Sequence, residues 1–191
     1  MPRRATALLL TAGLAGVTML LPSLFRKRRT TREADDERYA DLNRPEWAPP
    51  AYAFPIAWTV STVALAATGA HLLLRPRHRR RGELLTYLGV HAALYATFSR
   101  VYFDERSPVL AAGWTAGDFL VCHLAFYRAL GVSGRVAAGF VPVNLWLTLA
   151  APLALYQAAA NRDPIYGDLG VEIGEVVAGA LGVSPIGRER A

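Results

Sequence analysis

Long stretches without a charged residue are the feature that most constrains how this chain folds. Ala5–Phe25 is 21 residues long and carries no charge. At about 1.5 Å per residue, a helix of that length crosses a hydrocarbon core of about 30 Å. Ala51–Leu74 and Val136–Ala160 are also uncharged, while Leu84–Phe103 and Val109–Leu130 carry one or two charges. Since lipid leaves only helices or closed barrels as spanning structures, these blocks predict an all-α integral membrane bundle of five transmembrane helices.

The first block has a second interpretation, because Arg3 and Arg4 precede it as they would precede a signal peptide. The block is longer than a typical signal-peptide core, and no small-x-small cleavage site follows it. The basic run Arg26–Arg29 is typical of a stop sequence. We therefore expect the first block to be an uncleaved span.

Short links connect the later blocks, so consecutive helices are expected to be antiparallel neighbours. Residues 1–161 then form one five-helix domain, and 162–191 form a C-terminal tail. Within the tail, Gly170–Gly182 is short and interrupted by glycines, which leaves a surface helix or a disordered segment as the two alternatives. The polar connector between the first two blocks contains Arg32–Asp41, for which we expect an interfacial helical turn.

The net charge of +6 comes mainly from arginine clusters between the apolar blocks. Clusters such as Arg75–Arg81 in short links between spans indicate contact with anionic lipid headgroups and predict no nucleic-acid partner. Their distribution does not decide the orientation in the membrane. Cys122 is the only cysteine, so an intrachain disulfide is excluded.

A proline- and tryptophan-rich stretch, Asp41–Trp58, lies between the first two blocks. Proline fixes φ and lacks an N–H group, so Pro49 and Pro50 suit the turn before a helix and not its interior. The residue before each proline is held in extended geometry. The stretch is therefore expected to be a stiff loop ending at a helix in which Phe54 and Trp58, one turn apart, share a face.

With these features the chain resembles the TspO/MBR family, the tryptophan-rich sensory proteins related to the translocator (peripheral benzodiazepine receptor) protein. The resemblance covers Tyr39–Asn161. It rests on three motifs: Tyr39-x-x-Leu42-x-x-Pro45-x-Trp47-x-Pro49-Pro50-x-x-x-Phe54-x-x-x-Trp58-Thr59, then Val101-Tyr102-Phe103, and finally Val141-Pro142-x-x-x-Trp146.

The resemblance implies a multi-pass membrane protein, in the cell membrane if the chain is prokaryotic. It implies a hydrophobic ligand such as porphyrin, haem or a sterol inside the bundle, with a sensory, receptor-like or transport role and no required cofactor. Trp58 and Trp146 stand where the family has tryptophans implicated in tetrapyrrole binding and light-dependent porphyrin breakdown. A porphyrin-degrading photo-oxidative enzyme is thus one alternative. Packing, or anchoring at the membrane interface, is the structural alternative for both residues.

The chain departs from the family's pattern at several positions. His91, Tyr95 and Phe98 replace the usual Gln, Asn and Trp series, while Val143 and Ala154 replace Tyr and Asn. Several polar groups of the family's pocket are therefore missing. This favours a further alternative, a structural or partner-binding membrane protein that has lost its pocket.

His91, Tyr95 and Phe98 recur at helical spacing on one face of the third block, either as interhelical contacts or as a cavity wall. Trp47 and Trp58 are expected to cover the pocket, with Trp146 facing it. The predicted ligand-binding residues are Trp47, Phe54, Trp58, His91, Tyr95, Phe98, Asp118 and Trp146.

Asp118 is unusual because it lies in the middle of the fourth block. A carboxylate at that depth costs about 2.5–3.5 kcal/mol on insertion scales, so it must be neutral, paired or hydrated. Its partner is expected to be His71, His91 or Arg100. A hydrogen bond that fixes the helix register, a polar anchor in a cavity and a step in a proton path remain alternatives.

No catalytic constellation and no metal site are expected, because the chain has no G-x-S-x-G, H-E-x-x-H or P-loop pattern. Cys122, within an apolar helix, is expected to be an inert small hydrophobe. Gly113-x-x-x-Gly117 permits close helix approach, either in a homodimer or inside one chain.

Overall fold

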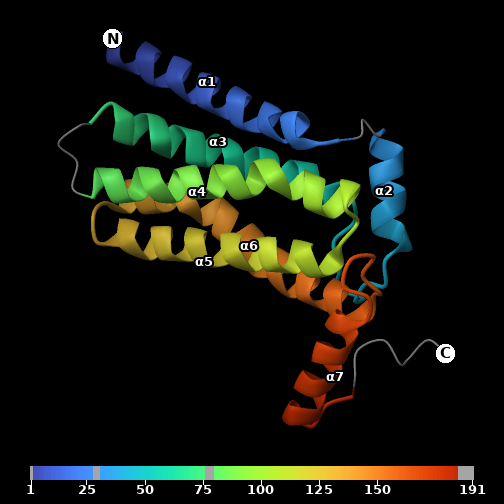
Figure 1. Ribbon diagram of the computed structural model, residues 1–191. Coiled ribbons are helices and arrows are strands. Elements are labelled where there is room, and N and C mark those ends of the chain that lie inside the picture. Colours follow the sequence, from blue (N-terminus) through green and yellow to red (C-terminus); the bar gives the residue numbers. More distant parts are fainter. Residues whose placement is uncertain (1, 28–30, 76–79, 185–191) are drawn as a thin grey trace.

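A computed structural model of the chain describes residues 2–27, 31–75 and 80–184, and its regular elements in these ranges are all helices (Figure 1). The all-α prediction is therefore confirmed. In chain order the elements are α1 (Pro2–Phe25), α2 (Arg32–Asp41), α3 (Ala53–Leu73), α4 (Arg81–Ser99), the π-helical turn η1 (Arg100–Asp104), α5 (Pro108–Leu130), α6 (Gly134–Ala160) and α7 (Leu169–Leu181).

Four of the helices, α1, α3, α5 and α6, are long and apolar enough to cross a membrane. The composition of α4 does not add a fifth, because Arg81 and Glu83 lie in its first turn and polar residues recur along it. The predicted third span, 84–103, also does not form one regular α-helix. It ends as an α-helix at Ser99 and continues as a π-turn in which Glu105 N–H donates to the Arg100 carbonyl at 3.0 Å.

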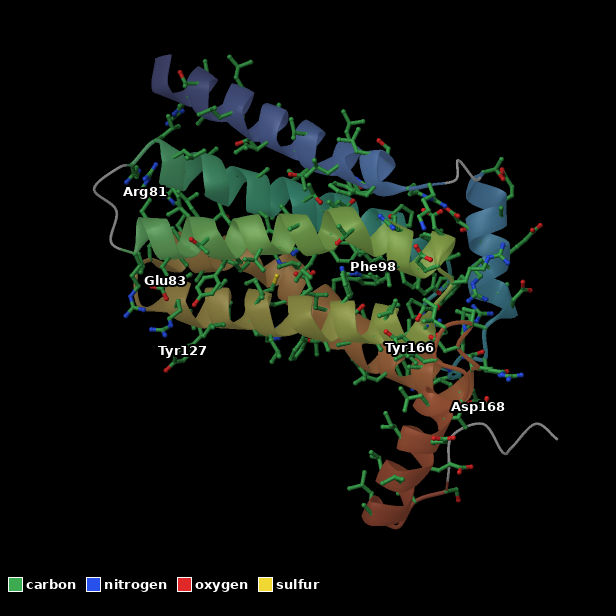
Figure 2. The ribbon with its side chains drawn as sticks, in the orientation of Figure 1. Arg81, Glu83, Phe98, Tyr127, Tyr166 and Asp168 are labelled. Atoms are coloured by element: carbon green, nitrogen blue, oxygen red, sulfur yellow. The ribbon has the colours of Figure 1, made fainter. Side chains whose placement is uncertain are left out.

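The helices α1, α3, α4, α5 and α6 lie side by side along a common direction (Figure 1). α1 packs on α3 and α4, α4 packs on α5, and α6 packs on both α3 and α5. α2 and α7 lie across this direction at one end of the bundle, and α7 contacts α6. Arg81 and Glu83 mark the opposite end from Tyr166 and Asp168 (Figure 2). Polar side chains thus gather where the two membrane surfaces are expected.

The main core lies between α3, α4, α5 and α6. Leu72, Leu84 and Ala125 have no exposed surface, and Phe140 and Leu147 of α6 complete this cluster. Outward-facing leucines cover α1, including Leu8, Leu9, Leu20 and Leu24. Such a continuous exposed apolar face is unfavourable in water and suits hydrocarbon.

Glycines of two kinds occur in the bundle. A Cβ on Gly139 of α6 would overlap Thr68 Oγ1 of α3, so a side chain there would push the two helices apart. By contrast, a Cβ on Gly113 or Gly117 of α5 would meet nothing within 4 Å. The Gly113-x-x-x-Gly117 motif therefore does not serve close packing among the described parts of the chain.

α2 is fixed to the end of the bundle by charged groups. It begins after Thr31, whose hydroxyl accepts a hydrogen bond from Ala34 N–H at 3.3 Å. The Arg26 guanidinium binds both carboxylate oxygens of Asp35 at 2.9 Å, which raises the pKa of Arg26 above its ordinary value. Lys27 Nζ contacts Glu105 Oε1 at 2.8 Å. The predicted interfacial turn at 32–41 is therefore a helix of 10 residues held across the bundle end.

Residues 28–30, which include Arg28 and Arg29 of the cluster Arg26–Arg29, lie outside the described residues, as do 76–79 of the cluster Arg75–Arg81 and 185–191 of the tail. The proposed headgroup contact of the second cluster therefore stays a prediction.

Candidate ligand-binding site

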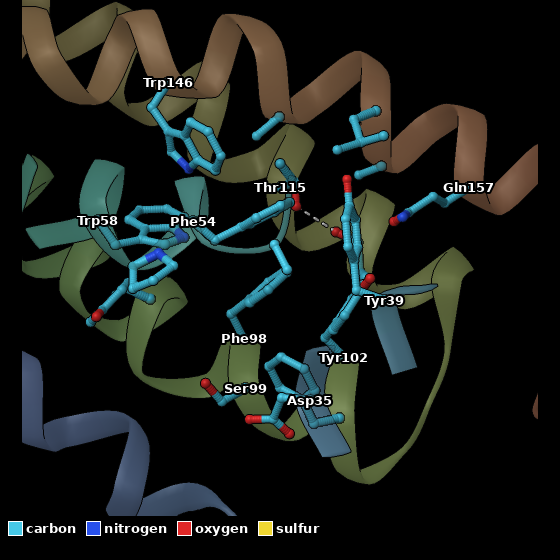
Figure 3. Close-up of a pocket in the computed structure, with 18 of the residues that line it drawn as sticks. Asp35, Tyr39, Phe54, Trp58, Phe98, Ser99, Tyr102, Thr115, Trp146 and Gln157 are labelled. Atoms are coloured by element: carbon cyan, nitrogen blue, oxygen red, sulfur yellow. Dashed lines mark hydrogen bonds between the residues drawn. The ribbon is translucent and has the colours of Figure 1, made fainter. Parts of the chain in front are cut away.

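A cavity of about 320 Å³ lies inside the bundle at the α2 end (Figure 3). Its walls come from α2, α3, the end of α4 with η1, α5 and α6. The volume is within the range of about 300–1,000 Å³ that is typical of small-molecule sites. Eight aromatic side chains line it: Tyr39, Phe54, Trp58, Tyr95, Phe98, Tyr102, Phe103 and Trp146.

Ring contacts hold the deeper aromatic residues in place. Phe54 meets Tyr39 edge-on at 4.9 Å and Trp146 edge-on at 5.1 Å between ring centroids. Trp58 contacts Tyr95 at 5.1 Å and Trp146 at 6.2 Å. Such pairs contribute about 0.5–1.5 kcal/mol each beyond burial, so this wall is expected to be rigid and able to offer ring faces and edges to a flat ligand.

The proline-rich loop leads from α2 into α3 beside the cavity, and Ala51 is its contribution to the lining. The Pro50 carbonyl accepts a hydrogen bond from Ala53 N–H at 2.9 Å, and α3 begins at that residue. Tyr39 of α2 donates its hydroxyl to the Pro49 carbonyl at 2.7 Å. Burial raises the pKa of Tyr39, although a hydrogen bond from Arg44 opposes the change. The phenol is therefore a neutral donor that fixes the loop to α2.

Few polar groups interrupt the aromatic lining. Thr115 donates its hydroxyl to the Ala111 carbonyl of its own helix at 2.8 Å, so its proton is already used. The indole N–H of Trp146 is buried and has no hydrogen-bond partner among the described residues. A buried donor without a partner is costly, and an acceptor atom on a ligand would satisfy it. Asp35 and Asp36 of α2 also belong to the lining.

The structure brings five of the predicted site residues together on the cavity wall: Phe54, Trp58, Tyr95, Phe98 and Trp146. Trp47 is not among the lining residues. It sits in a turn closed by Ala48 N–H donating to the Pro45 carbonyl at 3.0 Å, and 51% of its side chain is exposed. Tyr39, which is buried, occupies the place at the loop that was expected for Trp47.

His91 and Asp118 do not line this cavity but form a buried pair behind it. His91 Nδ1 lies 2.8 Å from Asp118 Oδ1 and joins α4 to α5. Of the three partners expected for Asp118, the structure therefore selects His91. Trp58 separates the pair from the cavity and lies over the imidazole at 6.4 Å, with the two rings nearly parallel.

Asp163 was missed by the sequence analysis. It is 2% exposed and accepts hydrogen bonds from Ser107 Oγ at 2.6 Å and from the N–H groups of Val109, Ile165 and Tyr166 at 2.8–3.0 Å. Burial raises its pKa, but these donors outweigh burial and hold the pKa below its ordinary value. Ser107 caps the start of α5, but nothing in the sequence spacing pointed to an acceptor 56 residues away.

A second missed contact joins the proline-rich loop to the end of α6. Asn43 N–H donates to Asn161 Oδ1 at 2.8 Å, and Asn161 Nδ2 donates back to the Asn43 carbonyl at 3.1 Å. Asn43 Nδ2 also donates to the Ala160 carbonyl at 2.9 Å. This reciprocal pair holds the loop against α6.

Comparison with known sequences is consistent with this arrangement. A sequence model of the TspO/MBR family matches residues 7–159. A tryptophan-rich sensory protein of Cereibacter sphaeroides is 27% identical over 120 residues, which cover 62% of this chain and 73% of the relative. Protein CrtK of Rhodobacter capsulatus is 25% identical over 135 residues, which cover 66% of this chain and 81% of the relative.

Proposed function

The chain belongs to the TspO/MBR family, and on that premise we propose that it binds a flat hydrophobic ligand of the porphyrin, haem or sterol class inside the bundle. The chain is an integral, multi-pass membrane protein, and its bacterial relatives indicate the cell membrane. The proposed role is sensory, receptor-like regulation or transport. The observation that carries the proposal is the cavity of about 320 Å³ with its aromatic wall.

The proposal includes a fifth crossing by α4. This helix has 19 residues and is therefore about 28 Å long, close to the thickness of the hydrocarbon core. It runs alongside its neighbours and packs against α1, α3 and α5, so most of its polar groups have protein beside them instead of lipid (Figure 1). A span shielded in this way needs less apolar character than one that faces lipid.

Ligand binding is driven, in this proposal, by burial of a flat apolar surface against rings that are already ordered. Burial contributes about 25 cal/mol per Å² of apolar area, and a rigid wall loses little side-chain freedom when the ligand arrives. In this proposal, affinity comes mainly from contact between the ligand and the aromatic rings of the wall.

The cavity also bears on the alternative in which the pocket has been lost. Such a chain would be expected to pack side chains solidly beneath the loop, whereas space is open there. Val143, which departs from the family's pattern, is fully buried in the core and does not line the cavity. Ala154 does line it, so that departure removes bulk from the wall and leaves room for a ligand. These points support binding over a purely structural role.

The test is a titration of protoporphyrin into the purified protein, followed by quenching of tryptophan fluorescence. We expect saturable quenching, and we expect Trp58→Phe and Trp146→Phe to weaken binding several-fold, about the free energy of one aromatic contact. Trp47→Phe is the matched control, since the same change outside the cavity should leave affinity unchanged. A sterol titrated in competition distinguishes the ligand classes.

Two outcomes would remove the proposal: quenching that never saturates, or parental affinity in both cavity variants. The same complex tests the degradation alternative, in which Trp58 or Trp146 is the redox-active side chain. A bilin-like product that forms on illumination would support that alternative. Slow bleaching at the rate of free pigment would contradict it.

A further inference from the structure

Three metal-ligating side chains converge behind the aromatic wall. His91 of α4 and Asp118 and Cys122 of α5 place one ligand atom each within 4.8 Å of the others. His91 Nδ1 is 2.8 Å from Asp118 Oδ1, and Cys122 Sγ is 3.4 Å from His91 Nδ1 and 3.6 Å from Asp118 Oδ1. All three residues are at least 96% buried.

The arrangement differs from a hydrogen-bonded catalytic relay. A nucleophile–histidine–acid relay uses both ring nitrogens, with the nucleophile on one and the acid on the other. Here the thiol and the carboxylate approach the same nitrogen, Nδ1 of His91. Three electron-pair donors around one point form the kind of shell that a cation occupies.

The separations fit a tetrahedral transition-metal ion. Bonds of about 2.0–2.3 Å from nitrogen, oxygen and sulfur imply ligand–ligand distances of roughly 3.3–3.6 Å around a tetrahedral centre. The two sulfur distances are already in that range, and the nitrogen–oxygen distance needs to lengthen by about 0.5 Å. Asp118 and Cys122 are one turn apart on the same helix, so the adjustment falls on the contact between α4 and α5.

Charge balance points to a divalent ion. A carboxylate and a thiolate together carry two negative charges, and a neutral imidazole carries none. One divalent cation therefore makes the cluster neutral, which is the state that a core within hydrocarbon favours. No lysine or arginine of the described residues forms an ion pair with Asp118, so neutralisation falls to His91 or to a bound ion.

A small void lies next to Asp118 on the side of the cavity, although it does not reach His91 or Cys122. The void has a volume of about 10 Å³, and four of its lining residues also line the cavity: Trp58, Tyr95, Phe98 and Thr115. That volume is close to the minimum for one water molecule. Sites with three protein ligands and an exchangeable fourth are typical of zinc that acts on a ligand, whereas purely structural zinc has four protein ligands.

We propose that His91 Nδ1, an Asp118 carboxylate oxygen and Cys122 Sγ bind one divalent transition-metal ion of the zinc class, with water or a donor atom from the cavity as the fourth ligand. Mixed nitrogen, oxygen and sulfur donors in a tetrahedral shell select such an ion over magnesium or calcium. The ligands come from two helices and are 27 and 31 residues apart, which explains why no short motif predicted the site.

The experiment is a Co²⁺ titration of the metal-stripped, full-length protein, purified without a polyhistidine tag. We expect one Co²⁺ per chain, tetrahedral bands in the visible spectrum and a thiolate-to-cobalt charge-transfer band. Because Cys122 is the only cysteine, that band reports on this site alone. We expect Cys122→Ser to abolish it, Asp118→Asn and His91→Gln to weaken Co²⁺ binding at least tenfold, and Zn²⁺ to displace Co²⁺.

His123→Gln is the matched control. His123 lies on α5, the helix of Asp118 and Cys122, but its Nδ1 is hydrogen-bonded to the Phe119 carbonyl at 2.9 Å and takes no part in the cluster. It should bind Co²⁺ as the parent does. Should His91→Gln or Asp118→Asn fail to fold, the parent and the shape-conserving Cys122→Ser still decide the matter. Absence of the charge-transfer band in the parent, or parental Co²⁺ affinity in Asp118→Asn, would overturn the proposal. No porphyrin is present, so the result is independent of the ligand proposed for the cavity.

Discussion

Asp163 illustrates how much of the bundle end depends on one carboxylate. It joins the start of α5 to the loop after α6 through Ser107, Val109, Ile165 and Tyr166. Asn at this position keeps one acceptor oxygen but loses the charge. We expect Asp163→Asn to lower the free energy of unfolding by about 1–3 kcal/mol, the usual cost of disrupting a buried, charge-assisted network. Thermal unfolding in one fixed detergent measures the difference.

The same carboxylate gives a pH dependence of defined sign. Its pKa in the folded protein is below its ordinary value, so its stabilisation is complete above about pH 4, the pKa of an unfolded aspartate. The stabilisation is lost as the pH falls through the folded-state pKa. The stability gap between the parent and Asp163→Asn should therefore be constant near neutrality and should narrow below about pH 4. A gap that widens on acidification would contradict this assignment.

The partner of Asp118 and the position of Trp47 could not be predicted from the sequence alone. The cost of placing Asp118 in a membrane predicted a partner, and the candidates were three residues on other helices. Only the packing of α4 on α5 brings His91 to within 2.8 Å of it. Trp47 was expected to cover the cavity, but it lies in the turn that begins at Pro45 and is half exposed.

Among the helices, the contact between α3 and α6 depends on a residue without a side chain. We expect Gly139→Ala to destabilise the protein by about 1–3 kcal/mol, because its Cβ would overlap Thr68 Oγ1. Gly113→Ala is the same substitution on α5 and changes helix propensity equally, but a Cβ there meets nothing within 4 Å. Its effect on stability should therefore be neutral or favourable. Equal melting temperatures for the two variants would contradict the close approach.

The open face of α5 is also where a second copy would approach in the homodimer that the glycine spacing allows. Gly113→Leu with Gly117→Leu should then lower the dimer fraction measured by cross-linking, without lowering the stability of the single chain. An unchanged dimer fraction would place any self-contact elsewhere.

α7 is expected to lie in the membrane interface. It crosses the bundle direction (Figure 1), packs Gly170 and Gly174 against Ala158 and Ala159 of α6, and leaves Ile173 exposed. Glu175 lies on roughly the opposite face from Ile173 at 100° per residue. Spin labels at Ile173→Cys and Glu175→Cys, in a Cys122→Ser background, form a matched pair. Oxygen dissolved in lipid should relax the label at position 173 more than the label at position 175. A water-soluble relaxation reagent should have the opposite preference.

The helix positions could largely be predicted from the sequence, because an uncharged run long enough to cross the membrane is expected to form a helix. α1, α3, α5 and α6 begin and end within about three residues of the predicted blocks. The π-turn at Arg100–Asp104 was not readable, since its i+5 hydrogen bond and the placement of Tyr102 on the cavity wall depend on contacts with α2, α5 and α6. The tail was undecided because the short, glycine-containing α7 depends on α6 for its packing.

At the scale of the whole molecule, the number of membrane crossings determines whether the two ends of the chain lie on the same side of the membrane or on opposite sides. The start of α1 and the position of α7 are at opposite ends of the bundle (Figure 1). If α4 crosses the membrane with the four apolar helices, reporter domains fused to the N- and C-termini should lie on opposite sides. Reporters on the same side would remove the fifth crossing. A reporter inserted between α4 and α5 should lie on the opposite side from the N-terminus if α4 crosses, and on the same side if it does not.

The contact between Asn43 and Asn161 has a consequence for biosynthesis. The two residues are 118 positions apart, so the ribosome releases the second long after the first has left the exit tunnel. Until then the proline-rich segment is held only on the α2 side, through Tyr39, and the wall of the cavity that α6 supplies is missing. A ligand of the proposed class would therefore not be enclosed before α6 is complete. Nascent chains arrested ahead of residue 161 should acquire and lose pigment faster than the finished protein.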